Sequence, residues 1–93
     1  MNNSVTFNNE DNTYIFNCPH CYNLVQVSKA ETNCLIFRHG IYKQNFTQIN
    51  PHLPKIECDK LIEQDLIFGC GKPFKLVRNS NNIIDRVEIC DYI

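Results

Sequence analysis

The chain has 93 residues, of which six are cysteine and three histidine, with 43% hydrophobic residues and a formal net charge of −1 at neutral pH. A domain of this length buries only roughly 60% of its unfolded surface, so small domains often depend on a cross-link or a metal ion. The balanced charge excludes the long-range positive field typical of nucleic-acid-binding proteins and a polybasic membrane-surface segment. We therefore expect a thin core that cysteine and histidine side chains help to stabilise.

The N-terminal residues 1–12 are rich in asparagine and poor in apolar side chains, which indicates partial disorder, although Val5 and Phe7 alternate as in a short edge strand. The chain does not open with a basic segment followed by an apolar one, and no apolar run approaches the ~18 residues of a membrane span. We expect an intracellular protein, neither secreted nor in a membrane, with reduced thiols. Residues 13–93 are expected to form a single zinc-binding domain.

Short β-prone runs separated by turns follow in chain order. Residues 13–16 and 24–27 predict a hairpin whose tip is the tetrapeptide CPHC at 18–21. A polar turn over 29–33 then precedes a third β-prone run at 34–37. The first half of the domain therefore consists of strands and turns.

The second half of the chain contains the one predicted helix. After a long loop over 43–53, Pro54 suits a first helical turn, and apolar residues repeat on one side of a helix to about residue 64. Residues 74–77 and 83–92 predict two more strands around the NSNN turn at 79–82. The expected fold class is α+β, a small zinc-ribbon-like domain of short antiparallel strands with one helix at about 54–64.

The spacing of the cysteines indicates a metal site. Two cysteines in a C-x-x-C turn, Cys18 and Cys21, direct two thiolates at one ion, and Zn²⁺ accepts four such ligands tetrahedrally. Glycines on both sides of Cys70 allow a second tight turn, but the residue three positions earlier is Ile67 and not cysteine. Cys58, near the start of the predicted helix, is the first choice for the missing ligand, because a helix N-terminus favours a thiolate. We therefore predict a structural Zn²⁺ site made of Cys18, Cys21, Cys58 and Cys70.

Four more residues are substitute ligands or functional residues: His39, His52, Cys34 and Cys90. Cys34 and Cys90 lie in apolar strand runs, where free cysteine is commonly part of the core. His39 and His52 suit either a hydrogen-bonded structural role or ligation. The remaining histidine, His20, is expected to point to solvent.

A site closed by four thiolates has no vacant position for water, so the sequence favours a non-catalytic recognition module that binds another protein. One alternative is a nucleic-acid-binding zinc ribbon with a local basic face. This face would contain Lys72, Lys75, Arg78 and Arg86.

Two enzyme alternatives use the same motifs. A small ββα-type metal nuclease would employ His39 and His52, but a clear Asp-His pair and a basic groove are missing. The sequence CPHC followed by Tyr22 is similar to the active site of the bacterial periplasmic disulfide oxidase. The 17 residues before Cys18 are too few for the β-α-β unit that precedes the motif in a thioredoxin fold. We therefore expect no enzymatic activity.

A string of motifs carries a family resemblance. Six segments resemble a group of small uncharacterised proteins encoded by large DNA viruses: CPHC at 18–21, NCLIFRHG at 33–40, QINPH at 48–52, CD at 58–59, GCGKPF at 69–74 and CDYI at 90–93. The similarity implies a zinc-ribbon-like viral protein that acts in the host cytoplasm or nucleus. It also implies that Arg38-His39-Gly40 and Asn50-Pro51-His52 belong to the pattern, without giving either a role.

Overall fold

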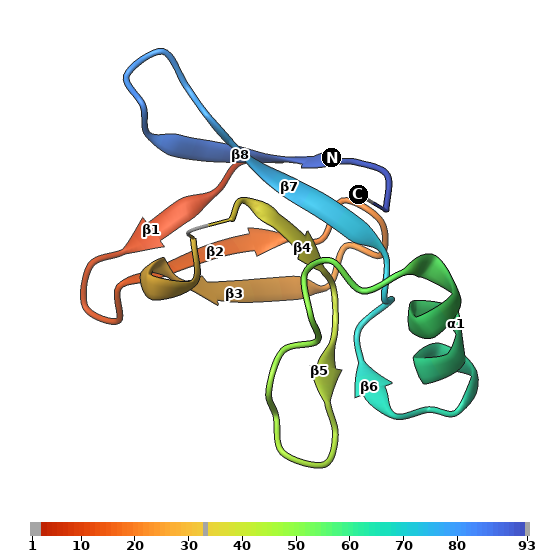
Figure 1. Ribbon diagram of the computed structural model, residues 1–93. Helices are drawn as coiled ribbons and strands as arrows, with labels where there is room; N and C mark the ends of the chain where they lie inside the picture. Colours follow the sequence, from red (N-terminus) through yellow and green to blue (C-terminus); the bar gives the residue numbers. More distant parts are fainter. Residues whose placement is uncertain (1–2, 33, 93) are drawn as a thin grey trace.

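The computed structural model describes residues 3–32 and 34–92. Over these residues the chain forms eight short strands in antiparallel pairings and one α-helix, which confirms the predicted α+β class. The strands make two three-stranded sheets and one two-stranded sheet (Figure 1). Parts of two sequence predictions, the disorder of residues 1–2 and the end of the turn at Asn33, lie outside the described residues.

The first sheet contains β1 (Thr6–Asn8), β2 (Thr13–Asn17) and β3 (Leu24–Ser28), in that spatial order. The β1 strand lies where the alternation of Val5 and Phe7 indicated an edge strand. The β2–β3 hairpin has the predicted CPHC tip, and a 3₁₀-helix, Lys29–Glu31, follows it.

The second sheet contains β4 (Ile36–Arg38), β7 (Pro73–Arg78) and β8 (Ile84–Ile89), with β7 in the middle. Pro73 lies opposite Arg38. The neighbouring pair is hydrogen-bonded, because the His39 N–H donates to the Lys72 carbonyl. Bonded and non-bonded pairs alternate along an antiparallel ladder, so Pro73 and Arg38 exchange no hydrogen bonds. A proline is tolerated at this central strand because it is the first residue of the strand and its missing N–H is not needed.

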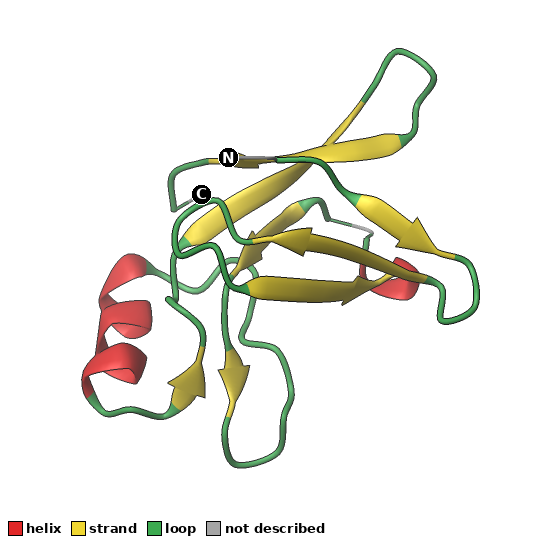
Figure 2. Cartoon of the chain, turned by 180° about the vertical axis from the view of Figure 1, so that it is seen from behind, coloured by secondary structure: helices red, strands yellow, loops and turns green. Residues whose placement is uncertain are grey.

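The residues before β1 join the two sheets along one side. Ser4 bridges Arg86, and the Val5 N–H donates to the Asp85 carbonyl at 3.0 Å. The six strands therefore follow the order β3-β2-β1-β8-β7-β4 around a shared core, and β3 and β4 are the two outer edges of an incomplete barrel (Figure 2). The buried side chains of this core are Phe16, Val27, Phe37, Phe74, Leu76, Ile84 and Val87.

Residues 40–69 form a separate lobe beside the sheets (Figure 1). It contains β5 (Ile41–Tyr42), α1 (Lys55–Glu63) and β6 (Ile67–Phe68), with β5 and β6 paired. The helix begins directly after Pro54 and lies within the predicted range of 54–64. In the described part of the chain, no helix has the length and apolar character needed to cross a bilayer.

Candidate metal centre

Four side chains converge between the sheets and the lobe: Cys18, Cys21, His39 and Cys70. Their candidate ligand atoms all lie within 4.8 Å of one another. The Cys18 and Cys70 sulfurs are 3.7 Å apart, and the His39 Nδ1 lies 3.3 Å from the Cys21 sulfur and 3.4 Å from that of Cys70. Three thiols and an imidazole at these separations form a cluster that could hold a metal ion.

The first half of the cluster is the CPHC turn at the tip of the β2–β3 hairpin. The Tyr22 N–H donates to the Cys18 carbonyl at 2.9 Å and closes the turn, while the Cys18 N–H donates to the Asn23 carbonyl. Tyr22 adopts a left-handed conformation with φ of 67°, and the Asn17 amide donates to its carbonyl at 3.0 Å. This turn directs both cysteine sulfurs to the same point.

The second half of the cluster joins two segments that are distant in sequence. His39 directly follows β4, and Cys70 precedes β7, the antiparallel neighbour of β4. The Gly71 N–H donates to the His39 carbonyl at 2.7 Å, which keeps the two ligand segments side by side. The position that a second C-x-x-C would fill is therefore taken by a histidine from the adjacent strand.

Glycine at position 69 allows this close approach. Gly69 has φ of 109°, and a Cβ atom there would lie 2.6 Å from the His39 carbonyl oxygen, closer than real Cβ contacts come. Gly71, on the other side of Cys70, also has a positive φ of 70°. The GCG sequence is thus needed to bend the chain around the cluster, as its composition indicated.

His20 lies inside the CPHC turn, and its side chain does not point to solvent as predicted. It is half-buried, and its Nε2–H donates to the Pro73 carbonyl at 2.6 Å. Because that carbonyl can only accept, the proton lies on Nε2. His20 therefore attaches the turn to the start of β7 and does not join the cluster.

The Cys18 and Cys70 sulfurs share one hydrogen bond, which shifts the pKa values of the two thiols in opposite directions. Accepting it from Cys70 lowers the pKa of Cys18 to about 3, although burial acts in the opposite direction. The same hydrogen bond, together with burial, raises the pKa of the Cys70 thiol. Because a metal ion binds thiolates, an ion at this position would compete with the proton of this hydrogen bond.

Cys58, the predicted fourth ligand, does not reach this cluster. The helix α1 turns its side chain into the core of the lobe, where only 1% of the residue is exposed and Ile49 and Ile67 surround it. Its sulfur donates to the Leu53 carbonyl at 3.7 Å, and burial raises the pKa of its thiol. The structure therefore brings three of the four predicted cysteines together with His39, one of the substitutes considered in the sequence, and leaves Cys58 apart from them.

The other substitute residues lie outside the cluster. The Cys34 sulfur contacts His52 Nε2 at 3.4 Å, in a separate pair. Cys90 follows β8, and burial raises the pKa of its thiol. Cys34 and Cys90 are both partly exposed, in contrast to the buried core positions considered for them. The two histidines considered for a nuclease, His39 and His52, contact different cysteines.

Comparison of the chain with known protein families, with curated proteins and with solved structures gave no match.

Proposed function

We propose that the chain is a small, zinc-stabilised recognition module without catalytic activity, and that it binds another protein. The Cys₃His cluster is the observation that carries this proposal. Zinc binds thiolates at about 2.3 Å in a tetrahedron, which places neighbouring sulfurs about 3.8 Å apart. The separation of 3.7 Å between the Cys18 and Cys70 sulfurs agrees with that value.

The arrangement supports a structural rather than a catalytic ion. Catalytic zinc sites have three protein ligands and an open position for water, whereas four protein donors close the coordination shell. His39 and Cys70 also flank the lobe, which begins at Gly40 and ends at Gly69. An ion at this point would fix both ends of the lobe to the CPHC turn.

Exposed aromatic side chains on the lobe favour a protein partner. The rings of Phe46 and Phe68 stack with centroids 6.3 Å apart, and these residues are 73% and 52% exposed. Ile41, paired with Phe68 across β5 and β6, is also exposed. Adjacent exposed apolar side chains of this size are typical of protein-binding surfaces.

The charge distribution gives nucleic acid less support as the partner. Lys75 and Arg86, two of the basic residues on the C-terminal strands, lie 4.0 and 3.2 Å from carboxylate oxygens of Glu88. This carboxylate offsets part of the positive charge on these strands. Steep, salt-dependent binding to generic DNA or RNA would therefore argue against the proposal.

Metal analysis of two matched cysteine variants tests the zinc site. The purified protein is expected to contain one equivalent of zinc. Cys18→Ser should lose this metal, because the cluster loses a ligand, whereas Cys58→Ser should retain it. Elemental analysis of the three proteins gives the readout. A folded wild-type protein without stoichiometric zinc, or loss of zinc from Cys58→Ser alone, would contradict the proposed site.

A further inference from the structure

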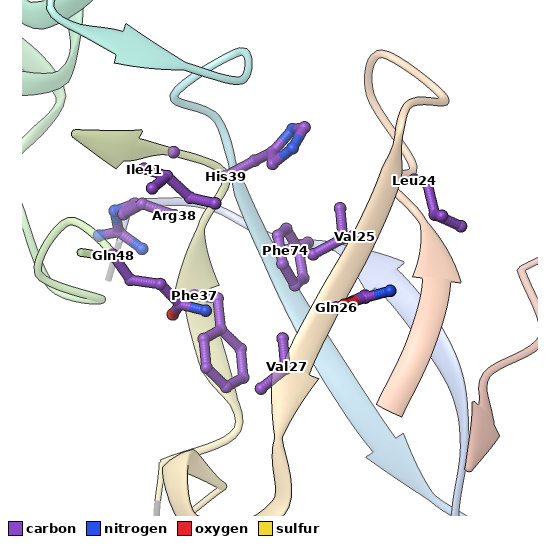
Figure 3. A pocket seen from close by; sticks show the side chains of 11 residues that line it. Leu24, Val25, Gln26, Val27, Phe37, Arg38, His39, Ile41, Gln48 and Phe74 are labelled. Atoms are coloured by element: carbon purple, nitrogen blue, oxygen red, sulfur yellow. The ribbon is translucent and has the colours of Figure 1, made fainter. Parts of the chain in front are cut away.

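The incomplete barrel has a groove between its two outer edges. The groove has a volume of about 330 Å³ and is lined by residues 24–27 of β3 and by residues 37–41 along and beyond β4. Phe74 of the middle strand β7 forms part of its floor (Figure 3). In strand order, it occupies the place of a strand that would close the barrel.

The main chain of β3 offers hydrogen-bonding groups on the side of this groove. Two hydrogen bonds at its ends show which residue pairs of the β2–β3 ladder are hydrogen-bonded. The Cys18 N–H donates to the Asn23 carbonyl, and the Lys29 N–H donates to the Asn12 carbonyl. In antiparallel strands the bonded pairs alternate, so Val25 and Val27 bond β2. The N–H and C=O groups of Leu24 and Gln26 then point away from β2, towards the open edge.

Side-chain directions support the same conclusion. Figure 3 shows Val25 directed towards Phe74, while the side chains of Leu24 and Gln26 point to the other side of β3. Leu24 and Gln26 therefore border the groove through their backbones. Most of the other lining residues are apolar, and Arg38, His39 and Gln48 add polar groups on the opposite side. Backbone donors and acceptors along a largely apolar groove match an extended peptide, which offers the complementary groups and side chains on alternate faces.

We propose that this groove binds an extended segment of another protein, which adds a strand to the open edge of β3 and places alternate apolar side chains between β3 and β4. The inference deepens the proposed function, on which it rests, by naming the class of partner. A single peptide strand suits a groove with a wall on each side. A second copy of this chain could offer its own β3 edge only together with the attached β2 and β1, in a groove that β4 borders on its other side.

A proline scan of the open edge tests the proposal on the zinc-loaded chain. Short linear peptides of random sequence are selected by display, and the affinity of a synthetic selected peptide is measured for three proteins: wild type, Gln26→Pro and Gln26→Ala. Proline removes the outward N–H of residue 26 without breaking a bond to β2, whereas alanine keeps this N–H. We expect Gln26→Pro to weaken binding by on the order of tenfold and Gln26→Ala to leave it nearly unchanged.

A second arm leaves the protein intact, so it does not depend on the folding of the proline variant. The selected peptide is synthesised with N-methyl groups at every second residue, in each of the two phases. Loss of binding in at least one phase supports backbone pairing. Equal binding of both methylated peptides and the unmodified one would overturn the proposal.

Other outcomes also decide against the groove. Three results would each overturn it. They are failure to select any peptide, undiminished binding to Gln26→Pro, and peptides that bind only at the surface formed by Phe46 and Phe68. A zinc-loaded dimer that Gln26→Pro dissociates would assign the edge to a second copy instead. Failure of the proposed function is recognised separately, because it shows as missing zinc in the wild-type protein whatever the peptides do.

Discussion

The sheets and the lobe are stabilised in different ways. Around Phe74 the sheets pack aromatic rings, with the centroids of Phe16 and Phe37 at 5.3 and 5.7 Å. Among the described residues, seven buried side chains form this core, whereas the lobe buries three, namely Ile49, Cys58 and Ile67. The sheets therefore bury a larger apolar core than the lobe, and in our proposal the lobe depends more strongly on attachment at its ends.

Surface interactions do not compensate for the small core of the lobe. The Lys43–Asp65 ion pair is short, at 2.7 Å, but 83% of the Asp65 side chain is exposed to solvent. Exposed pairs of this kind contribute about 0–1 kcal/mol. The α1 helix also leaves Ile56 and Ile62 exposed. The metal cluster at the ends of the lobe is therefore its main stabilising element in our proposal.

Removal of the metal should have the largest effect. Structural zinc binds with an apparent free energy of about 10–16 kcal/mol, comparable to the ~5–15 kcal/mol net stability of a domain. A chelator should therefore abolish the cooperative thermal transition. Amide hydrogen exchange should increase first and most within residues 40–69. An apo protein with an unchanged melting transition would contradict a structural metal site. It would also contradict the proposed difference in stabilisation between the sheets and the lobe.

Acidification provides the same test without a chelator. Thiols must lose their protons to bind a metal, so the affinity falls as the pH decreases. Metal release followed against pH should coincide with loss of protection in the lobe. Loss of lobe protection well before metal release would separate the two events.

Substitution of Gly69 should produce an intermediate effect. Gly69→Ala places a methyl group against the His39 carbonyl in a left-handed conformation. The backbone strain alone costs about 1–3 kcal/mol, and metal affinity should fall with it. Gly40→Ala is the matched control, because its added methyl group meets the flexible ends of Ile67 and Ile49. Competition with a metal indicator measures both affinities, and equal losses would argue against the contact at His39.

Replacement of Tyr22 should have the smallest effect, and in the stabilising direction. A non-glycine residue in the left-handed region costs about 1–2 kcal/mol, and glycine relieves this cost while losing more entropy on folding. Because Tyr22 is 52% exposed, little packing is lost. Tyr22→Gly should therefore raise the free energy of unfolding by up to about 1 kcal/mol in denaturant titrations. A clear destabilisation would indicate that the tyrosine ring contributes to the turn.

Local sequence signals predicted the local parts of the structure. Pro54 and the helical repeat of apolar residues gave α1, and the spacing of CPHC and the GCG glycines indicated where the chain bends around the cluster. The assignment of His39 required the pairing of β4 with β7, which depends on contacts between residues distant in sequence. A histidine directly after one β-prone run and a cysteine just before another was the available signal for this pairing.

The placement of Cys58 shows why local signals were insufficient. Its position on the apolar side of the helix suits a metal ligand and a core residue equally well. The outcome depends on which surface the helix contacts. In the structure this surface is formed by Ile49 and Ile67, so the thiol belongs to the core of the lobe.

The lobe starts one residue after His39 and stops one residue before Cys70, so its two ends meet at a single anchoring point. A different insert between Gly40 and Gly69 would change none of the residues of the cluster, of the GCG sequence or of the two three-stranded sheets. The cluster thus provides one fixed attachment point, where loops of other lengths could be inserted to change what the molecule recognises in our proposal.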